Sequence, residues 1–567
     1  MKITRHLYWL IYLLFFSCAK QSAPTGGPKD TIPPTLVRSI PANQEVNFKG
    51  RSVQLTFSEF IQLQNPKEQI IITPAMGKDF EVTARKKTVT IKFERDFDDS
   101  TTYTINFRDA VQDLTEKNPA RNLKLAISTG SYIDSLSLEG SVYELLTGKE
   151  MKDITVAIHE PNDTFNIFKH PAAYFTKTDN KGFFKLQNLK NGVYYIYAIE
   201  DKNKNLIADS RNESYGFLTD SINLTENVSG KSIPLIRLDA RTLKLTSARP
   251  YNTYFNIRTS KSLKFFTARF DNRETISSFA EDQSNVKVFN NIGDLDSLAL
   301  KFTATDSIGN YLDTTLYVKF PNREVQPDRF ESTLQHSSII ANKGLLTAKF
   351  KFNKPLKSIN FDSLFYRIDS LQRITFNTEN IHWDSAQNIM TLEKKVDKTL
   401  FLPPVINPVT KDQAKPKAPP VNKRNIPSPK KQANNELVIG QAAFISIELD
   451  SSKALRQSIR PSRTDELGVI LVDIKTTQKN FIVQLLDKSF TVIQTIKNQT
   501  QLKFEDLPPA DYQLRLIIDQ NQNGLWDPGN FLLNMEPEPI RYYRNEKGTQ
   551  TFTLKTNWEL GPLLITY

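Results

Sequence analysis

Apolar and polar residues alternate in short runs along most of the chain beyond residue 34. Apolar side chains occupy every second position in segments 53–57, 89–93, 103–107 and 123–127, with mostly polar residues between them. A period of two places the apolar residues on one face of an extended strand. Short strands of this kind, separated by turn residues, predict an all-β fold of tandem antiparallel β-sandwiches.

The length predicts how many sandwiches there are. At about 100–150 residues per domain, 567 residues correspond to four or five domains. Residues 23–34 contain four prolines and two glycines and cannot form a core, so 18–34 is predicted to be a Pro/Gly tether. The predicted domains, joined by short linkers, are residues 35–130, 131–240, 241–325, 326–463 and 464–567.

One segment of the chain occurs twice. A shift of 318 residues, without a gap, aligns the following pairs: Leu186 with Phe504, Leu189 with Leu507, Tyr194 with Tyr512, Ile199 with Ile517, and Asp201 with Asp519. Such self-similarity predicts that 131–240 and 464–567 are two copies of one structural unit.

Two family resemblances refine this division. Residues 33–130 open with PPTLVRSIP, contain TFSE at a strand end and close with STG. These features resemble the bacterial Ig-like domain of S-layer-type proteins. Residues 346–355 are similar to the strand that ends in TFSE, so 326–463 is expected to be a second Ig-like β-sandwich.

The duplicated segment carries the second resemblance. Residues 178–201 read TDNKGFFKLQNLKNGVYYIYAIED, which is similar to prealbumin-like, carboxypeptidase-regulatory-like β-sandwich modules. This resemblance implies that 131–240 and 464–567 are spacers or recognition modules without catalysis of their own.

The N-terminus has the pattern of a secretory signal peptide. Lys2 and Arg5 precede ten apolar residues at 7–16, too few to span a bilayer, and Ser17 precedes the only cysteine, Cys18. This arrangement resembles the lipobox of bacterial lipoproteins. The resemblance implies a signal peptide at 1–17 and Cys18 as the acylated N-terminus of the mature chain. The alternative is an ordinary signal peptide followed by a cysteine without function.

The residues after Cys18 bear on location. Ala19 stands where some lipoproteins carry the aspartate that retains them in the inner membrane, and 20–22 (KQS) is not the acidic cluster that marks surface export. The resemblance therefore implies the outer membrane, with a periplasm-facing anchor favoured over the cell surface.

Charge is concentrated in one interval. Residues 403–431 contain eight prolines, seven Lys/Arg, one Asp and no aromatic residue, which predicts a disordered Lys/Pro-rich insertion at 403–436. Loss of Lys2 and Arg5 lowers the net charge of +12 to +10, and the interval accounts for +6 of that. The remaining +4 and the lack of interleaved aromatics argue against a nucleic-acid partner. A solvated spacer is favoured over contact with envelope polyanions.

The repeat contains a candidate metal site. Each copy has oxygen-bearing side chains at positions 1, 3, 5 and 9 of a loop, and a weak calcium site needs such alternate oxygens. The alternative is that these side chains bond their own backbone and shape the turn. Gly524 favours calcium in the second copy. The candidate ligands are Asp201, Asn203, Asn205 and Asp209, and Asp519, Asn521, Asn523 and Asp527.

Other sequence patterns bear on modification and catalysis. Asp-Ser/Thr pairs such as Asp306-Ser307 and Asp369-Ser370 resemble a bacterial O-glycosylation sequon, and the alternative is a turn before a strand. The sequence has no H-E-x-x-H, G-x-S-x-G, P-loop or dinucleotide motif. Glu536 and Glu538 are read as an extended edge segment rather than a catalytic pair. No catalytic residue and no cofactor other than calcium is predicted.

These observations predict a non-enzymatic, lipid-anchored cell-envelope protein that acts as a scaffold or as an adhesion and interaction module. Its partners would be the membrane, through the N-terminal lipid, and an envelope protein or polysaccharide. The alternative is a carbohydrate-binding accessory lipoprotein of the outer membrane, with aromatics such as Trp526 presented on loops. A hydrolase is a third class of function that the sequence leaves open.

Overall fold

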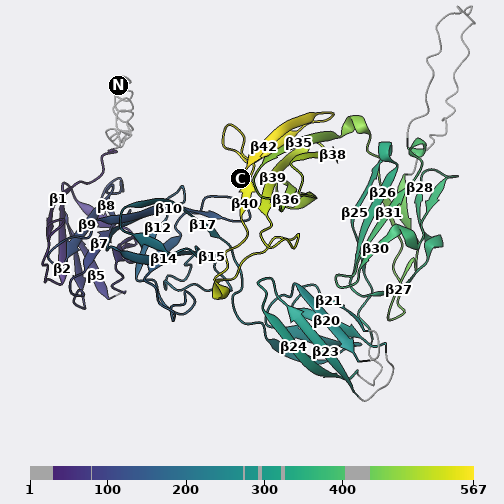
Figure 1. The fold of residues 1–567 in the computed structure, drawn as a ribbon, viewed down its shortest axis with the longest axis horizontal. Helices are drawn as coiled ribbons and strands as arrows, with labels where there is room; N and C mark the ends of the chain where they lie inside the picture. Colours follow the sequence, from purple (N-terminus) through teal and green to yellow (C-terminus); the bar gives the residue numbers. More distant parts are fainter. Residues whose placement is uncertain (1–29, 78, 272–274, 292–296, 321–325, 402–434) are drawn as a thin grey trace, which may run out of the picture. The chain divides into compact units, whose positions relative to one another are not determined.

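The architecture is that of a computed structural model, which describes residues 30–77, 79–271, 275–291, 297–320, 326–401 and 435–567 (Figure 1). The predicted signal peptide, Cys18 and most of the 403–436 insertion lie outside these residues. Glu436, at the end of that predicted insertion, is the first residue of strand β32. In the described part of the chain, no helix is long and apolar enough to cross a membrane.

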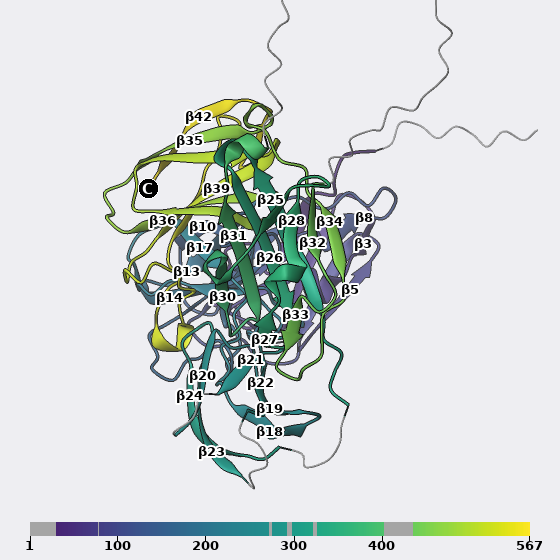
Figure 2. The same cartoon turned by 90° about the vertical axis from the view of Figure 1, so that its right-hand side faces the viewer.

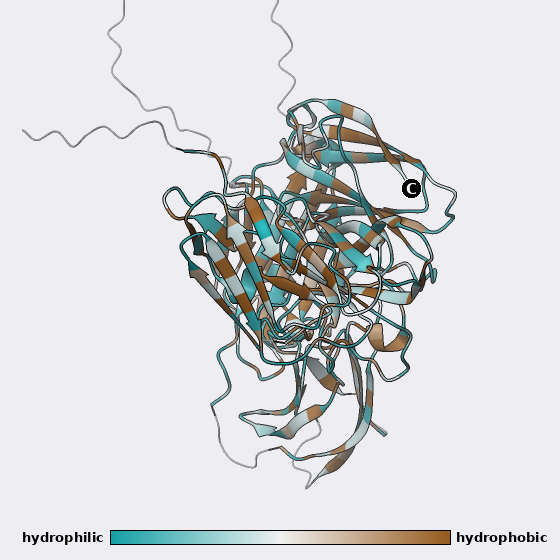
Figure 3. Ribbon diagram, turned by 90° about the vertical axis from the view of Figure 1, so that its left-hand side faces the viewer, coloured by the Kyte–Doolittle hydropathy of each residue, from teal (hydrophilic) through white to brown (hydrophobic). Residues whose placement is uncertain are grey.

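The predicted all-β fold is confirmed. The described residues form strands numbered up to β42, a single four-residue helix, α2 (Pro66–Gln69), and short 3₁₀ turns. Alternating bands of apolar and polar residues run along the strands in Figure 3. The chain divides into two compact units. Unit 1 comprises 1–142, 152–207 and 220–232, and unit 2 comprises 143–151, 208–219 and 233–567.

Unit 1 begins with a sandwich whose alternating residues fill its core. Val53, Leu55, Val89 and Ile91 are fully buried. One sheet has the order β1 (Leu36–Ile40), β2 (Ser52–Phe57), β6 (Thr88–Phe93), β5 (Phe80–Arg85). A second sheet has the order β4 (Ile71–Thr73), β7 (Thr102–Asn106), β9 (Lys124–Ser128). A third sheet pairs β3 (Ile61–Leu63) with β8 (Val111–Asp113).

The second sandwich begins in unit 1. Three strands form one sheet, in the order β13 (Phe183–Leu189), β10 (Leu136–Glu144), β17 (Val228–Leu235). The facing sheet contains, in spatial order, β12 (Tyr174–Lys177), β11 (Thr155–His159) and β14 (Gly192–Ile199), and β16 (Ile222–Leu224) also pairs with β14. In unit 2, β15 (Tyr215–Phe217) bridges to Ile236.

Unit 2 continues with a third sandwich, whose core includes Ile257, Val286 and Phe302. Its first sheet has the order β18 (Leu245–Tyr251), β19 (Tyr254–Thr259), β22 (Asn285–Phe289), β21 (Ile276–Phe279). Its second sheet has the order β20 (Phe265–Phe270), β23 (Leu298–Thr305), β24 (Tyr311–Val318).

The strands of the fourth sandwich are seen in Figure 2. Its core includes the buried side chains of Phe350, Tyr366 and Phe444. One four-stranded sheet has the order β25 (Ser332–Ile340), β26 (Leu345–Phe352), β31 (Ile389–Lys395), β30 (Ile381–Asp384). The other four-stranded sheet has the order β29 (Arg373–Thr375), β28 (Leu364–Arg367), β32 (Glu436–Ile439), β34 (Leu455–Ser458). A two-stranded sheet joins β27 (Leu356–Ile359) and β33 (Phe444–Ser446).

The fifth sandwich buries Ile470, Val483 and Phe504 in its core. One sheet has the order β38 (Gln501–Leu507), β35 (Gly468–Lys475), β42 (Glu559–Thr566), and the other has the order β37 (Val492–Lys497), β36 (Phe481–Asp487), β39 (Ala510–Ile518), β40 (Ile540–Tyr542). Strand β41 (Phe552–Leu554) also pairs with β39. Strands β35 and β42 are parallel, because the chain crosses from β41 in the facing sheet before it enters β42. The purely antiparallel pattern expected from the sequence was wrong at this pair.

The repeat is reproduced strand by strand. The 318-residue shift places β13 on β38 and β14 on β39. Both copies have the same bulge, since Leu189 pairs with Leu136 and Leu186 with Leu138, as Leu507 pairs with Gly468 and Phe504 with Ile470. Asn188 and Asp506 at this bulge have φ angles of 57° and 59°. The two segments therefore share register as well as sequence pattern.

Candidate functional site

The two Asp/Asn loops have the same hydrogen-bond pattern. Asp519 Oδ1 accepts the backbone N–H of Asn523 at 3.1 Å, and Oδ2 accepts that of Gly524 at 2.8 Å. In the first copy Asp201 accepts from Asn205 at 3.0 Å and from Leu206 at 3.1 Å. The carboxylate at position 1 thus closes a turn in both loops, as the turn-forming alternative predicts.

The amide side chains at positions 3 and 5 also shape the turns. The Oδ1 atoms of Asn203 and Asn521 each accept the N–H two residues later at 3.1 Å. Those of Asn205 and Asn523 accept from Ile207 at 2.8 Å and from Leu525 at 2.7 Å. Four candidate ligand oxygens therefore already bond to their own loops.

The aspartates at position 9 differ in their surroundings. Asp527 Oδ2 accepts the side-chain amides of Asn521 at 2.7 Å and Asn523 at 2.6 Å, and Lys264 Nζ lies 3.8 Å from Oδ1. Asp209 Oδ2 accepts from the Asn212 side chain at 2.8 Å. Within the described residues, no group of three or more His, Cys, Asp or Glu side chains could hold a metal. Calcium binding at these loops stays a prediction.

A buried glutamate supports each loop, a role that the sequence pattern does not predict. Glu538 accepts the backbone N–H of Gln520 at 2.7 Å and that of Asp527 at 3.0 Å. Glu213 accepts the N–H of Asp209 at 2.8 Å. Burial raises the pKa of Glu538. The signal is weak in the sequence, because these glutamates lie 11 and four residues beyond position 9.

The acidic pair at 536–538 does not converge on one point. Glu538 faces its own loop, whereas Glu536 Oε1 accepts the backbone N–H of Thr219 at 2.7 Å and its hydroxyl at 2.8 Å. Each carboxylate therefore holds a different segment of unit 2.

Trp526 is used for packing. Its Nε1 donates to the Glu538 carbonyl at 3.1 Å, and its ring packs on a cluster that includes Leu145, Ile236 and Ile517. The indole is partly buried in this cluster rather than fully presented on the loop surface. This arrangement weakens the case for Trp526 as a carbohydrate platform.

Two of the Asp-Ser positions form turns in which the aspartate carboxylate accepts backbone N–H groups. Asp306 Oδ1 accepts the N–H groups of Ile308 at 3.1 Å and Asn310 at 2.8 Å. Asp369 Oδ1 accepts from Leu371 at 2.7 Å. Glycosylation of the adjacent serines stays a prediction.

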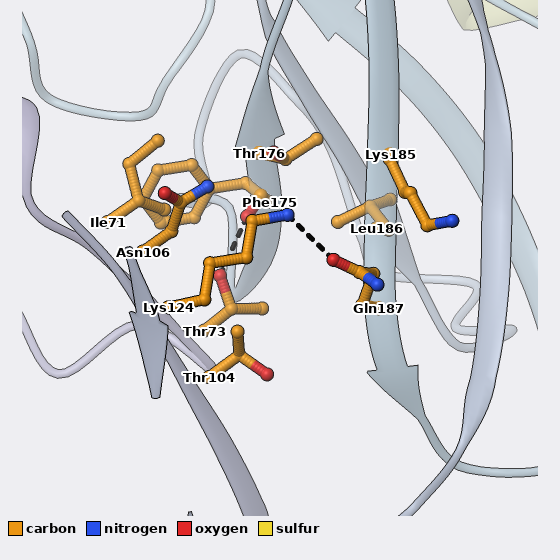
Figure 4. A pocket seen from close by; sticks show the side chains of 10 residues that line it. All are labelled: Ile71, Thr73, Thr104, Asn106, Lys124, Phe175, Thr176, Lys185, Leu186 and Gln187. Atoms are coloured by element: carbon orange, nitrogen blue, oxygen red, sulfur yellow. Dashed lines mark hydrogen bonds between the residues drawn. The ribbon is translucent and has the colours of Figure 1, made fainter. Parts of the chain in front are cut away.

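A second candidate region is the junction of the two sandwiches in unit 1. Figure 4 shows a hollow between strands β4, β7 and β9 of the first sandwich and β12 and β13 of the second. Thr73 Oγ1 donates to the Phe175 carbonyl at 2.7 Å, and Lys124 Nζ donates to Gln187 Oε1 at 2.7 Å. Burial, and then Lys185, lower the pKa of Lys124. The hollow holds only about 20 Å³, room for a water molecule and not for a larger ligand.

Comparison with known proteins supports the first sandwich. Residues 30–129 match the bacterial Ig-like domain family. The expected Ig-like domain at 35–130 thus coincides with a family match. No curated protein matched the chain.

Solved structures show only a distant likeness. The TIE protein of Bacillus anthracis is 10% identical, with a TM-score of 0.12 over 99% of this chain and 78% of that one. The major pilin subunit BcpA of Bacillus cereus is 10% identical, with a TM-score of 0.12 over 76% and 98%. The S-layer protein rSbsC is 10% identical, with a TM-score of 0.14 over 93% and 67%.

Proposed function

We propose that the protein is a non-enzymatic, lipid-anchored protein of the cell envelope that acts as a scaffold or adhesion module. The observation that carries this proposal is that buried polar contacts, and not only linkers, join the first sandwich to the second and the third to the fourth. In unit 2, Asn388 Nδ2 of the fourth sandwich donates to Ser278 Oγ of the third at 2.8 Å, and both side chains are buried. In unit 1, Thr73 and Phe175 make the corresponding tie.

Such ties suit a spacer. A tandem array with side-chain contacts between neighbours keeps its domains at a fixed reach, whereas flexible linkers alone allow free domain motion. The Ig-like match at 30–129 is compatible with this role. Sheet edges and loops would then supply the contacts with partners.

The anchor is the second part of the proposal. The basic residues at 2 and 5, the apolar run at 7–16 and Cys18 support acylation of that cysteine. More than one acyl chain gives stable attachment, because each buried methylene contributes about 0.8 kcal/mol. Ala19 supports the outer membrane as the location, and the absence of an acidic cluster at 20–22 favours a chain that faces the periplasm over one on the cell surface.

Metabolic labelling with an alkyne fatty acid tests the anchor. The native chain is expected to carry the label and to enter the detergent phase. Cys18→Ser is expected to lose both properties, and the control Ser22→Ala is expected to keep them. Label retained by Cys18→Ser would contradict the anchor. Cross-linking of the native protein in its own envelope, followed by mass spectrometry, tests the scaffold role, which requires a reproducible envelope partner.

Carbohydrate binding is a second candidate, favoured by one exposed sheet face. Tyr311 and Tyr317 on β24 are 62% and 75% exposed, and Phe265 on β20 is 58% exposed. The register aligns Phe265, Thr305 and Tyr311 across the sheet. Exposed aromatic rings can stack on sugars. A glycan array should then lose its signal with Tyr311→Ala/Tyr317→Ala and keep it with Tyr132→Ala in the first half of the chain.

A further inference from the structure

Unit 1 contains a cavity far larger than the hollow of Figure 4. It is a half-open cavity of about 720 Å³ between the α2–β4 region of the first sandwich and, from the second, the start of β12 and the first half of the Asp/Asn loop. This volume falls within the range of about 300–1,000 Å³ that is typical of small-molecule sites. The cavity shares Ile71 and Phe175 with the small hollow.

The interior of the cavity is apolar. Its walls include Ile70, Ile72, Met76 and Phe80 from the first sandwich, and Ala172 and Phe175 from the second. All six residues are buried within the fold. A lining of aliphatic and aromatic side chains favours a ligand with an apolar body.

Two hydrogen bonds hold the two walls in place. The N–H of Ala75 donates to the Ala173 carbonyl at 2.7 Å, and Thr73 Oγ1 donates to the Phe175 carbonyl at 2.7 Å. Both bonds run from the β4 segment to the β12 segment. The cavity is thus preformed, which reduces the ordering cost of binding.

The rim carries charge that is only partly neutralised. Lys204 forms an ion pair with Glu68, and the Asp201 carboxylate accepts the N–H groups of Asn205 and Leu206. Lys177 is half-buried, and among the described residues no carboxylate lies within ion-pair distance of its Nζ. Desolvation, followed by the charge of Arg108, lowers the pKa of Lys177.

We propose that this cavity binds one long-chain carboxylate, the anion of a fatty acid. The aliphatic chain would lie among Ile70, Ile72, Met76 and Phe80, and the carboxylate would pair with Lys177 at the rim. An anionic head suits this position because it supplies the counter-charge that the half-buried ammonium lacks. The proposal is independent of the scaffold and anchor roles.

Titration calorimetry with dodecanoate, below its micelle concentration, tests the proposal on the full chain. Dodecanoate is expected to bind one to one, and octanoate is expected to bind at least tenfold more weakly because it buries fewer methylenes. Dodecyltrimethylammonium, which has the same chain and a cationic head, is also expected to bind at least tenfold more weakly.

Two variants locate the site. Lys177→Met is expected to weaken dodecanoate binding about tenfold, whereas Lys181→Met, at an exposed lysine of the same sandwich, is expected to leave it unchanged. Ala173→Trp, which fills the cavity from an exposed position, is expected to abolish binding while the melting temperature stays close to that of the native chain.

Four results would overturn the proposal, and three of them come from the ligands and variants above. These are no heat with dodecanoate, equal affinity for the anionic and cationic amphiphiles, or unchanged binding in both Lys177→Met and Ala173→Trp. Binding by Cys18→Ser but not by the acylated native chain would also overturn it, because that result would assign the cavity to the protein's own acyl group.

Discussion

Leu206 and Gly524 occupy the same position of the duplicated loop and share its left-handed backbone, with φ angles of 61° and 73°. Their N–H groups make the equivalent hydrogen bond, to Asp201 and Asp519 respectively. Glycine adopts this conformation freely, whereas a leucine side chain is strained in it by about 1–2 kcal/mol. The first copy therefore carries strain that the second lacks.

Leu206→Gly is expected to stabilise the protein. Relief of strain, offset by greater freedom of glycine in the unfolded chain, should raise the free energy of unfolding by about 0.5–1 kcal/mol. Scanning calorimetry would show this as a higher melting temperature. Gly524→Ala is the matched control and should lower the melting temperature. A lower melting temperature for Leu206→Gly, or a higher one for Gly524→Ala, would contradict the assignment.

Lys354 is expected to be critical for the fourth sandwich. Its buried ammonium lies 2.5 Å from Glu448 Oε2 and 2.9 Å from Asp450 Oδ2. Lys354→Met would leave two carboxylates unpaired and should lower the free energy of unfolding by about 3–5 kcal/mol. Urea unfolding would measure the loss. The exposed Lys357→Met should change it by less than about 0.5 kcal/mol, and a comparable loss in both variants would refute this role.

Asp113 should make the protein sensitive to acid. Its buried carboxylate accepts the N–H groups of Glu116 at 2.6 Å, Lys117 at 2.9 Å and Asn118 at 2.7 Å. Burial opposes ionisation, but these donors prevail and lower the pKa of Asp113. Its stabilising effect is therefore complete above the unfolded pKa of about 3.9 and is lost as pH falls through the lower folded pKa.

Asp113→Asn tests this linkage. The variant should be less stable at pH 7, by about 1–3 kcal/mol, and its melting temperature should fall less steeply below pH 4 than that of the native chain. Asp109→Asn, a nearby aspartate in the same sandwich, serves as the control. Parallel pH profiles for the native chain and Asp113→Asn would show that the turn does not depend on this charge.

Calcium is expected to bind the second Asp/Asn loop weakly, at millimolar concentration. Binding requires the Asn521 and Asn523 side chains to turn their oxygens from the loop toward the ion, which costs hydrogen bonds. Calcium should raise the melting temperature of the native chain, but not that of Asp527→Ala. No heat and no thermal shift at several millimolar calcium would remove this prediction.

The sequence predicted those features that depend on local pattern. The alternation at 53–57 and 89–93 fixed which residues face the first core, and the gap-free repeat anticipated the shared register of β13 and β38. Such patterns suffice because a strand buries alternate side chains wherever it lies.

Features that depend on distant contacts were not predictable. The role of Glu538 depends on the fold bringing it beside Gln520 and Asp527, and the parallel entry of β42 depends on a crossover between sheets. Lys177 alternates like its neighbours, and nothing near it in the sequence indicates that its ammonium has no carboxylate partner among the described residues.

The hairpin Tyr143–Met151 has a consequence for folding during synthesis. The Tyr542 hydroxyl donates to the Leu146 carbonyl, and Arg544 Nη2 donates to that of Gly148 at 3.1 Å, each across 396 residues. Contacts so distant along the chain form slowly. Until residues 482–544 have been synthesised this hairpin stays undocked, so that interval is when chaperones and proteases would compete for it.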